Sequence, residues 1–326
     1  MPPRRVARCL ASALAALLCG LAPAARTAAE QAGPTTADQP ALQVHFPDRA
    51  LLLDITRAGA RLAAAGVHGV IITSDDAGAT WTQAPSPVSS ILTCITFADA
   101  QRGWAAGHEG VILGTLDGGR TWSRVTAPTT TEDSFLDLLA LPDGRVLAGG
   151  AYGLYFLSRD AGATWERHPA LDEDMHINRL TAGASGTLYL AAEAGTLASS
   201  GDGGETWEPL EVPYEGSFYG LHELASGRLL AHGLRGHVFV SDDRGATWTP
   251  AAIDFNGLLA TAAEVAPGTI VLSGAGGRIF LSRDGGTTFS MGPASGLTAT
   301  AELIGSPASV VCVGDAGVRT IPLPQP

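Results

Sequence analysis

The sequence predicts an all-β protein, a seven-bladed β-propeller of four-stranded antiparallel blades, and three observations carry this prediction. The 326 residues include 41 glycines without a triplet period, which indicates many tight turns between short strands. A short motif built around an aspartate, a glycine and an aromatic residue recurs at nearly constant spacing. No segment after residue 30 combines a long apolar stripe of helical period with helix caps.

The recurring motif has the form S/T-x-D-x-G-x-T-W/F. Six copies occur, and the steps between their aromatic positions are 41, 43, 42, 41 and 41 residues. Their aspartate and aromatic residues are Asp76 and Trp81, Asp117 and Trp122, Asp160 and Trp165, Asp202 and Trp207, Asp243 and Trp248, and Asp284 and Phe289. Units of this length with four strands each are typical of propeller blades.

Each unit begins with an apolar run, which we expect to form an inner strand, followed by a hairpin. The hairpins close on Gly69, Gly110, Gly153, Gly195, Gly236, Gly277 and Gly317. The C-terminal segment supplies a seventh inner strand and hairpin but no aspartate motif. Because the edge of this last blade would be exposed, we expect an N-terminal strand, Leu42–Phe46, to join it and close the ring.

The residues of the motif suit a structural role. The aspartate can accept hydrogen bonds from backbone N–H groups of its own turn, and the glycine takes a conformation that other residues resist. The Trp or Phe is expected to fill the space between neighbouring blades. A calcium loop would need spaced oxygen ligands and a closing glutamate, which the motif lacks. We therefore predict that the motif residues have a structural role, and we expect that the protein binds no metal and no cofactor.

The N-terminus reads as a targeting segment. Arg4, Arg5 and Arg8 precede an apolar run of residues 9–22, and small residues follow it. We predict a signal peptide over residues 1–28, a flexible linker over 29–40 and the propeller over 41–326. A membrane anchor is the alternative, although the run is short for a span. The predicted location is the periplasm or the exterior, with no membrane span after cleavage.

Charge limits the classes of partner. All 20 basic residues are arginines and four of them precede residue 29, so 16 remain against 32 acidic residues, a formal net charge of −16. Such a chain is expected to bind neither nucleic acid nor anionic lipid. Cys94 and Cys312 lie in apolar runs of non-neighbouring blades, so we expect buried thiols. A disulfide between the two is the alternative.

With these motifs the chain resembles the Asp-box (BNR) propellers, in which the aspartate motif is called the Asp box. The stretch RGWAAGHEGVILGTLDGGRTW, Arg102–Trp122, is similar to the photosystem II stability and assembly factor family and its relatives in non-photosynthetic bacteria. The resemblance covers roughly residues 42–320. It implies a non-catalytic exported scaffold that helps a membrane complex to assemble or work.

The resemblance also bears on the partner. Photosynthetic members contact their client through an arginine-rich face, whereas the arginines of this acidic chain are scattered through the repeats. Relatives in non-photosynthetic bacteria look like accessory proteins of exporter-type membrane systems. We therefore expect a protein partner, an integral membrane complex of the transporter kind.

An exported glycoside hydrolase of the sialidase type is the alternative function, because those enzymes share the Asp box. Their chemistry needs three arginines that converge on a carboxylate, a Tyr–Glu nucleophile pair and an aspartate. Tyr214 and Glu215 are adjacent in one loop, but adjacency in sequence is not pairing in space. No three of the available arginines share an equivalent inner-strand position; these are Arg57, Arg102, Arg179 and Arg235.

The loops that enter the inner strands vary most between repeats. We expect them to share one face of the ring with the hairpin turns, and the Asp boxes to lie on the other face. Variable loops on a rigid scaffold commonly carry binding residues, and aromatic residues beside acids suit a protein interface. The predicted partner-binding residues are Glu132, Asp133, Asp172, Glu173, Asp174, His176, Tyr214, Glu215, Phe218, Tyr219 and Phe255. Ordinary solvated loops are the alternative interpretation.

Overall fold

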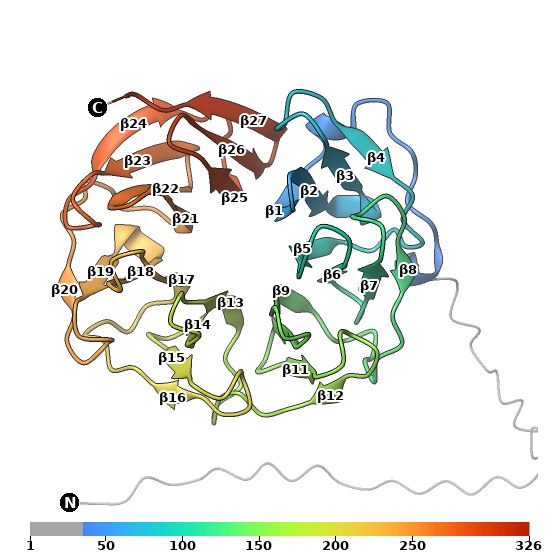
Figure 1. Ribbon diagram of the computed structural model, residues 1–326, viewed down its shortest axis with the longest axis horizontal. Coiled ribbons are helices and arrows are strands. Elements are labelled where there is room, and N and C mark those ends of the chain that lie inside the picture. The colour runs from blue at the N-terminus through green and yellow to red at the C-terminus, as the bar shows by residue number, and fades with distance from the viewer. Residues whose placement is uncertain (1–34, 326) are drawn as a thin grey trace, which may run out of the picture. The chain divides into compact units, whose positions relative to one another are not determined.

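A computed structural model describes residues 35–325, so the predicted signal peptide lies outside the described residues. These residues form seven antiparallel sheets arranged radially as a ring (Figure 1). Each sheet is built from consecutive strands, the first of which lies innermost. Short 3-10 turns are the only helical elements in the described part of the chain. The predicted seven-bladed propeller is confirmed.

The strands follow the repeat closely. Blades 1 to 3 contain β1 (Leu52–Ala58), β2 (Arg61–Gly66), β3 (Ile71–Ser74) and β4 (Thr82–Ala84); β5 (Leu92–Phe97), β6 (Gly103–Gly107), β7 (Ile112–Thr115) and β8 (Ser123–Arg124); and β9 (Phe135–Ala140), β10 (Val146–Gly150), β11 (Tyr155–Ser158) and β12 (Glu166–Arg167). Blades 4 to 6 contain β13 (Ile177–Ala182), β14 (Leu188–Ala192), β15 (Leu197–Ser200) and β16 (Glu208–Pro209); β17 (Phe218–Glu223), β18 (Leu229–Gly233), β19 (Val238–Ser241) and β20 (Thr249–Pro250); and β21 (Leu259–Ala266), β22 (Thr269–Gly274), β23 (Arg278–Ser282) and β24 (Ser290–Ala294). Blade 7 contains β25 (Thr300–Gly305), β26 (Ser309–Gly314) and β27 (Gly317–Pro322).

The hairpin glycines are required by both conformation and space. Gly69 has φ of +69°, in the left-handed region that glycine tolerates best. A Cβ atom built there would lie 1.9 Å from the carbonyl oxygen of Val88, in the loop that enters the next blade. The turn can therefore approach its neighbour only because this position has no side chain.

Each Asp box is a closed network of hydrogen bonds. In the first box the Asp76 carboxylate accepts from the Thr80 backbone N–H at 2.8 Å and from the hydroxyls of Thr80 and Ser74. The Ser74 hydroxyl oxygen in turn accepts from the Gly78 N–H at 2.8 Å. The other five boxes repeat the bonds from the threonine and from the serine or threonine that opens the motif.

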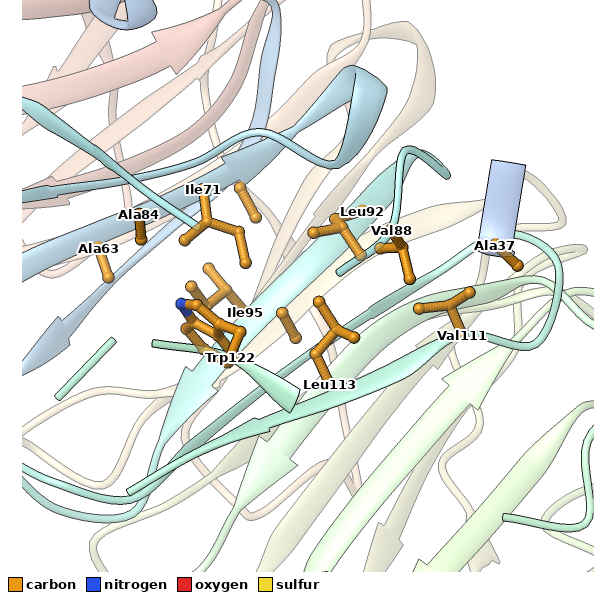
Figure 2. Close-up of a cluster of buried hydrophobic side chains, with 12 residues drawn as sticks. Ala37, Ala63, Ile71, Ala84, Val88, Leu92, Ile95, Val111, Leu113 and Trp122 are labelled. Carbon is orange, nitrogen blue, oxygen red and sulfur yellow. The ribbon is translucent and has the colours of Figure 1, made fainter. Parts of the chain in front are cut away.

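The aromatic residue of each box packs against the preceding blade. Figure 2 shows Trp122 of blade 2 beside Ala63, Ile71 and Ala84 of blade 1, in one cluster of buried side chains. The indole N–H of Trp122 donates to the Gly119 carbonyl of its own box at 3.2 Å, so the ring is buried without an unpaired donor. The boxes thus pin the outer strands and wedge adjacent blades together.

The predicted closure by an N-terminal strand is wrong. Blade 7 has three strands, and residues 42–46 form no strand; they run beside β4 of blade 1 instead. There the Gln83 side chain accepts from the Val44 N–H at 2.9 Å and donates to the Leu42 carbonyl at 2.9 Å. The ring closes by apolar packing between blades 1 and 7, where Leu52, Ile72 and Val313 share one cluster.

The folded body also begins earlier than residue 41. A 3-10 turn, η1 (Thr36–Asp38), packs on blades 1 and 2, and Ala37 is 3% exposed within their shared core. A second turn, η2 (Pro47–Arg49), packs against β27. We call residues 35–50 the N-terminal strap, because they cross from blade 2 over blade 1 to blade 7. Cys94 and Cys312 are buried free thiols, as expected.

Truncation of an aromatic wedge should destabilise the ring. Trp165 is 5% exposed and packs between blades 2 and 3. Trp165→Ala would leave a cavity there and should lower the free energy of unfolding by about 3–5 kcal/mol. Urea denaturation followed by tryptophan fluorescence measures this change. Leu116→Ala, at a side chain 79% exposed, is the control and should have little effect. Equal stability of the two variants would contradict the packing role.

The boxes should also make stability depend on acidity. Hydrogen bonds from Thr80, Thr206 and Thr247 lower the pKa of Asp76, Asp202 and Asp243 to about 2. Because the usual value is about 3.9, the unfolded chain binds protons first. The boxes therefore stabilise the protein fully above pH ~4, and this contribution is lost as the pH falls toward 2.

Thermal unfolding between pH 5 and 2 tests this expectation. The melting temperature should fall over that range in the wild-type protein, and the fall should be smaller in an Asp76→Asn/Asp243→Asn variant. An identical pH dependence for the two proteins would show that these carboxylates do not contribute.

Candidate functional site

The entering loops and hairpin turns do share one face of the ring, here called the loop face. In blades 2 to 5 the closing glycine of the hairpin donates its N–H to the loop that enters the next blade. These bonds run from Gly110 to Asp133, Gly153 to Met175, Gly195 to Gly216 and Gly236 to Gly257, at 2.7–3.0 Å. The Asp boxes instead contact the turns between first and second strands, as in the bond from Ala161 to Gly144 at 2.8 Å.

The N-terminal strap covers part of the loop face. Glu109, in the hairpin of blade 2, accepts hydrogen bonds from the Ala37 N–H at 2.8 Å and from the hydroxyls of Thr36 and Ser90. The hydrogen bond from the Thr36 hydroxyl is the main reason that the pKa of Glu109 is lowered. The sector of blades 1 and 2 is therefore occupied by the protein itself, and the sectors of blades 3 to 6 carry the predicted binding residues.

A groove of about 370 Å³ lies between the loop that enters blade 4 and the outer strands of that blade. Leu171, Met175 and Trp207 supply apolar walls, and Asp172 and Glu173 supply carboxylates. This combination of apolar surface and negative charge suits a partner segment that carries both apolar and basic side chains.

Two neighbouring features extend this surface. Tyr152, in the hairpin of blade 3, is 72% exposed, and its ring meets that of His176 edge-on at 4.7 Å. His176 Nδ1 lies 3.4 Å from the Glu193 carboxylate. Sequence reasoning missed Tyr152; the equivalent hairpin residues His68, Glu109, Ala194 and Arg235 share its positive φ, so only its aromatic character sets it apart.

The Tyr214–Glu215 loop borders a second hollow, of about 670 Å³, together with Arg235. The Tyr214 ring stacks on His237 at 4.2 Å, and its hydroxyl donates to the Leu234 carbonyl at 3.2 Å. The tyrosine is thus held by the neighbouring hairpin and does not pair with Glu215.

The remaining predicted residues divide between surface and core. Glu132 is exposed, and Asp133 accepts from the Thr130 N–H at 2.7 Å within its own loop. Phe255 packs against Phe280 at 4.9 Å. The assignment of Phe218 to the binding surface is wrong, because it is 0% exposed: as the first residue of β17, its ring points into the core between blades. Tyr219 is half-buried and Asp174 is exposed.

Sequence reasoning also missed a ring of residues in the central channel. Every inner strand has a register irregularity near its start, and the residue after it occupies an equivalent position in each blade. The seven residues are Asp54, Cys94, Asp137, Arg179, Gly220, Thr261 and Glu302. All but Cys94 and Gly220 line a cavity of about 190 Å³. An alignment of the inner strands at this position would have found them.

Charges converge across this channel. The Arg179 guanidinium of blade 4 forms an ion pair with Glu302 of blade 7, and its Nη1 lies 3.7 Å from the Asp137 carboxylate of blade 3. The arginine side chain is 22% exposed and the Glu302 side chain 10%. Asp54 and Asp137 also accept hydrogen bonds from the Ile95 and Leu180 N–H groups of the next blades, at 2.7 and 2.6 Å.

Burial shifts the titration of these groups. It raises the pKa of Asp137 to about 6, against the opposing charge of Arg179. Burial is the main cause that raises the pKa of Asp54, and the negative charge of Glu302 raises it further. For Arg179, burial opposes the charged form, but the charges of Glu302 and Asp137 outweigh it and raise the pKa. The cluster therefore keeps its arginine charged.

Two histidines fill the wall beside Gly220. The rings of His222 and His232 stack at 5.4 Å, and a Cβ at Gly220 would lie 2.2 Å from His232 Nε2. Burial lowers the pKa of His232 to about 4 and that of His222 well below its usual value. Both imidazoles are therefore neutral at physiological pH, and among the described residues no group of His, Cys, Asp or Glu is arranged to hold a metal ion.

Removal of the channel cation should be costly. Arg179→Met leaves three buried carboxylates without their counter-charge and should lower the free energy of unfolding by about 3 kcal/mol or more. A second substitution, Glu302→Gln, removes one of those charges, so the double variant should recover part of the loss. Chemical denaturation of the two single variants and the double variant measures the coupling. Strictly additive effects would contradict an ion pair across the channel.

The fold and these surfaces define a class: an Asp-box β-propeller with a partly covered loop face and a charged central channel. Residues 73–256 match the sequence profile of the family described as Photosynthesis system II assembly factor YCF48. This match spans more than half of the chain, and the chain belongs to that family. No curated protein sequence matches the chain significantly.

Solved structures show the same architecture. The structure described as YCF48 bound to D1 peptide is 21% identical, has a TM-score of 0.69, and the match covers 88% of this chain and 100% of that one. YCF48 from Cyanidioschyzon merolae is 17% identical with a TM-score of 0.67, covering 86% and 98%. The WD40 β-propeller domain of Doa1, 11% identical, reaches 0.69 with 89% and 96% coverage. At such identities the likeness concerns the fold alone.

Proposed function

We propose that the protein is a non-catalytic scaffold that binds a partner protein through the loop face of blades 3 to 5. The observation that carries this proposal is the groove beside the blade 4 loop, with apolar walls at Leu171, Met175 and Trp207 and carboxylates at Asp172 and Glu173. Membership of an assembly-factor family supports a scaffold, and the related structure with a bound D1 peptide supports a protein partner.

The proposal also covers the location of the protein and the kind of partner that it binds. The N-terminal sequence supports export, and the resemblance to accessory proteins of exporter systems supports an integral membrane complex as the client. No helix within residues 35–325 is long and apolar enough to cross a bilayer. An acidic, partly apolar groove fits a basic segment of such a complex, because opposite charges guide association and apolar anchors hold it.

Glycoside hydrolysis has weaker support. Tyr214 is held by Leu234 and His237 and does not pair with Glu215. Arg179 is the single arginine of the channel cavity, which at about 190 Å³ lies below the usual size of ligand pockets. We expect no cleavage of a panel of fluorogenic glycosides; turnover that is lost in Glu215→Gln would establish the enzyme instead.

Charge reversal tests the binding surface. Asp172→Lys/Glu173→Lys should reduce capture of the membrane partner from detergent-solubilised membranes by about tenfold or more, because both carboxylates line the groove. The matched control reverses Asp75 and Asp242, whose side chains are 73% and 70% exposed in the Asp boxes. Quantitative mass spectrometry of the captured proteins gives the readout, with thermal unfolding as the check on folding.

Two outcomes would contradict the proposal. One is equal capture by both charge-reversal variants, which would remove the loop face from the interaction. The other is capture without any integral membrane protein, which would leave a scaffold with a different client.

A further inference from the structure

Blade 7 lacks the fourth strand that covers the other six blades. Register equates Val318, Arg319 and Thr320 of β27 with the β3 residues Ile71, Ile72 and Thr73, which pair with β4. No strand formed by residues 35–325 pairs with the outer edge of β27, which lies at the rim of the ring (Figure 1). This edge therefore presents backbone groups without a strand partner.

A hollow adjoins the open edge. It measures about 500 Å³ and lies between β24 of blade 6 and the end of β27, with Leu281, Met291, Pro293 and Leu323 among its lining residues. This junction has no Asp box, and Ile321 and Leu323 stand where other blades place a Trp or Phe. Met291 is 62% exposed. Apolar surface thus lies next to unpaired backbone.

Three arginines lie on the strands and the turn that flank this junction. Arg278, Arg283 and Arg319 form no ion pair with any residue between 35 and 325, unlike arginines such as Arg145 and Arg159. In a chain with 32 acidic residues, unpaired arginines on neighbouring blades favour an acidic occupant.

Two features of β27 itself limit pairing along this edge. The Arg319 guanidinium donates to the Val318 carbonyl at 2.7 Å, and Pro322 ends the strand without an N–H. An incoming carboxylate would compete for Arg319 and free this carbonyl, whereas an incoming cation would not. The contact between Arg319 and the Val318 carbonyl therefore favours acidic segments over basic ones.

We propose that the outer edge of β27 binds an extended acidic segment of a partner protein by strand addition, with its apolar side chains in the adjacent hollow. The segment completes blade 7 as its fourth strand, and its carboxylates pair with Arg319 and Arg283. This is a second contact site, opposite in charge to the groove of blade 4 and independent of it. Recognition of this kind takes affinity from the backbone and specificity from alternate side chains.

Synthetic peptides probe the edge directly. The test peptide is an acetylated octapeptide of alternating valine and glutamate, beside a lysine counterpart and a version N-methylated along one edge. We expect the full-length protein to bind the glutamate peptide, and to bind the other two at least about tenfold more weakly, as measured by fluorescence anisotropy. Hydrogen–deuterium exchange should show protection, on binding, of the β27 amides that point away from β26.

Matched variants separate this site from other surfaces. Arg283→Glu/Arg319→Glu should reverse the preference between the glutamate and lysine peptides, whereas Arg120→Glu/Arg244→Glu, on the boxes of blades 2 and 5, should leave it unchanged. Asp172→Lys/Glu173→Lys should also leave peptide binding unchanged, so failure of the loop-face proposal would not affect this result.

Three results would overturn the proposal. Equal affinity for the glutamate and lysine peptides would remove the role of the arginines, and equal affinity for the N-methylated peptide would remove strand addition. Slow exchange, in the free full-length protein, of the β27 amides that point away from β26 would show that a segment of the chain, or a second copy at high concentration, already occupies the edge.

Discussion

An aromatic side chain wedged between successive blades is the contact on which this ring depends. The Asp box sets its position: the hydrogen bonds that Asp160 accepts from Thr164 hold the turn, and the turn aims Trp165 at the preceding blade. The indole N–H is satisfied within its own box at 3.1 Å, so the ring contributes apolar contact without an unpaired donor. Where the box is missing, at the junction of blades 6 and 7, Ile321 and Leu323 pack instead.

The rigid ring supports two kinds of polar surface that behave differently. On the loop face, side chains such as Asp172 and Tyr152 are available to a partner. In the channel, Arg179 and Glu302 connect blades that are not neighbours, and their charges are neutralised mainly by one another. When one partner of such a pair is removed, the main cost is the charge that stays buried without its partner. The channel charges thus link opposite parts of the ring, and the loop face carries the binding surface that we propose.

Much of the fold was predictable because the repeat states it six times. A constant spacing of aspartate and tryptophan fixes the blade length, and the hairpin glycines locate the turns. The closure was not predictable from the same pattern: residues 42–46 alternate as a strand would, but Gln83 binds their backbone and holds them beside blade 1. Phe218 failed as a surface residue because the aromatic character that suggests binding equally suits a core position. The channel residues were missed because they share only a position in the register. Their side chains differ in chemistry, so no common motif marks them in the sequence.

The N-terminal strap joins the two ends of the folded body. It leaves blade 2 through Thr36, passes blade 1, and reaches the last hairpin, where a Cβ at Gly317 would lie 1.9 Å from the Asp48 carbonyl oxygen. Blades 2 to 6 can form from contacts within short stretches of chain, whereas the strap and blade 7 must meet across more than 260 residues. Contacts of such long range form late. A nascent or threaded polypeptide would therefore hold an open arc of blades until its C-terminus emerged, and the circle would close in a single final step.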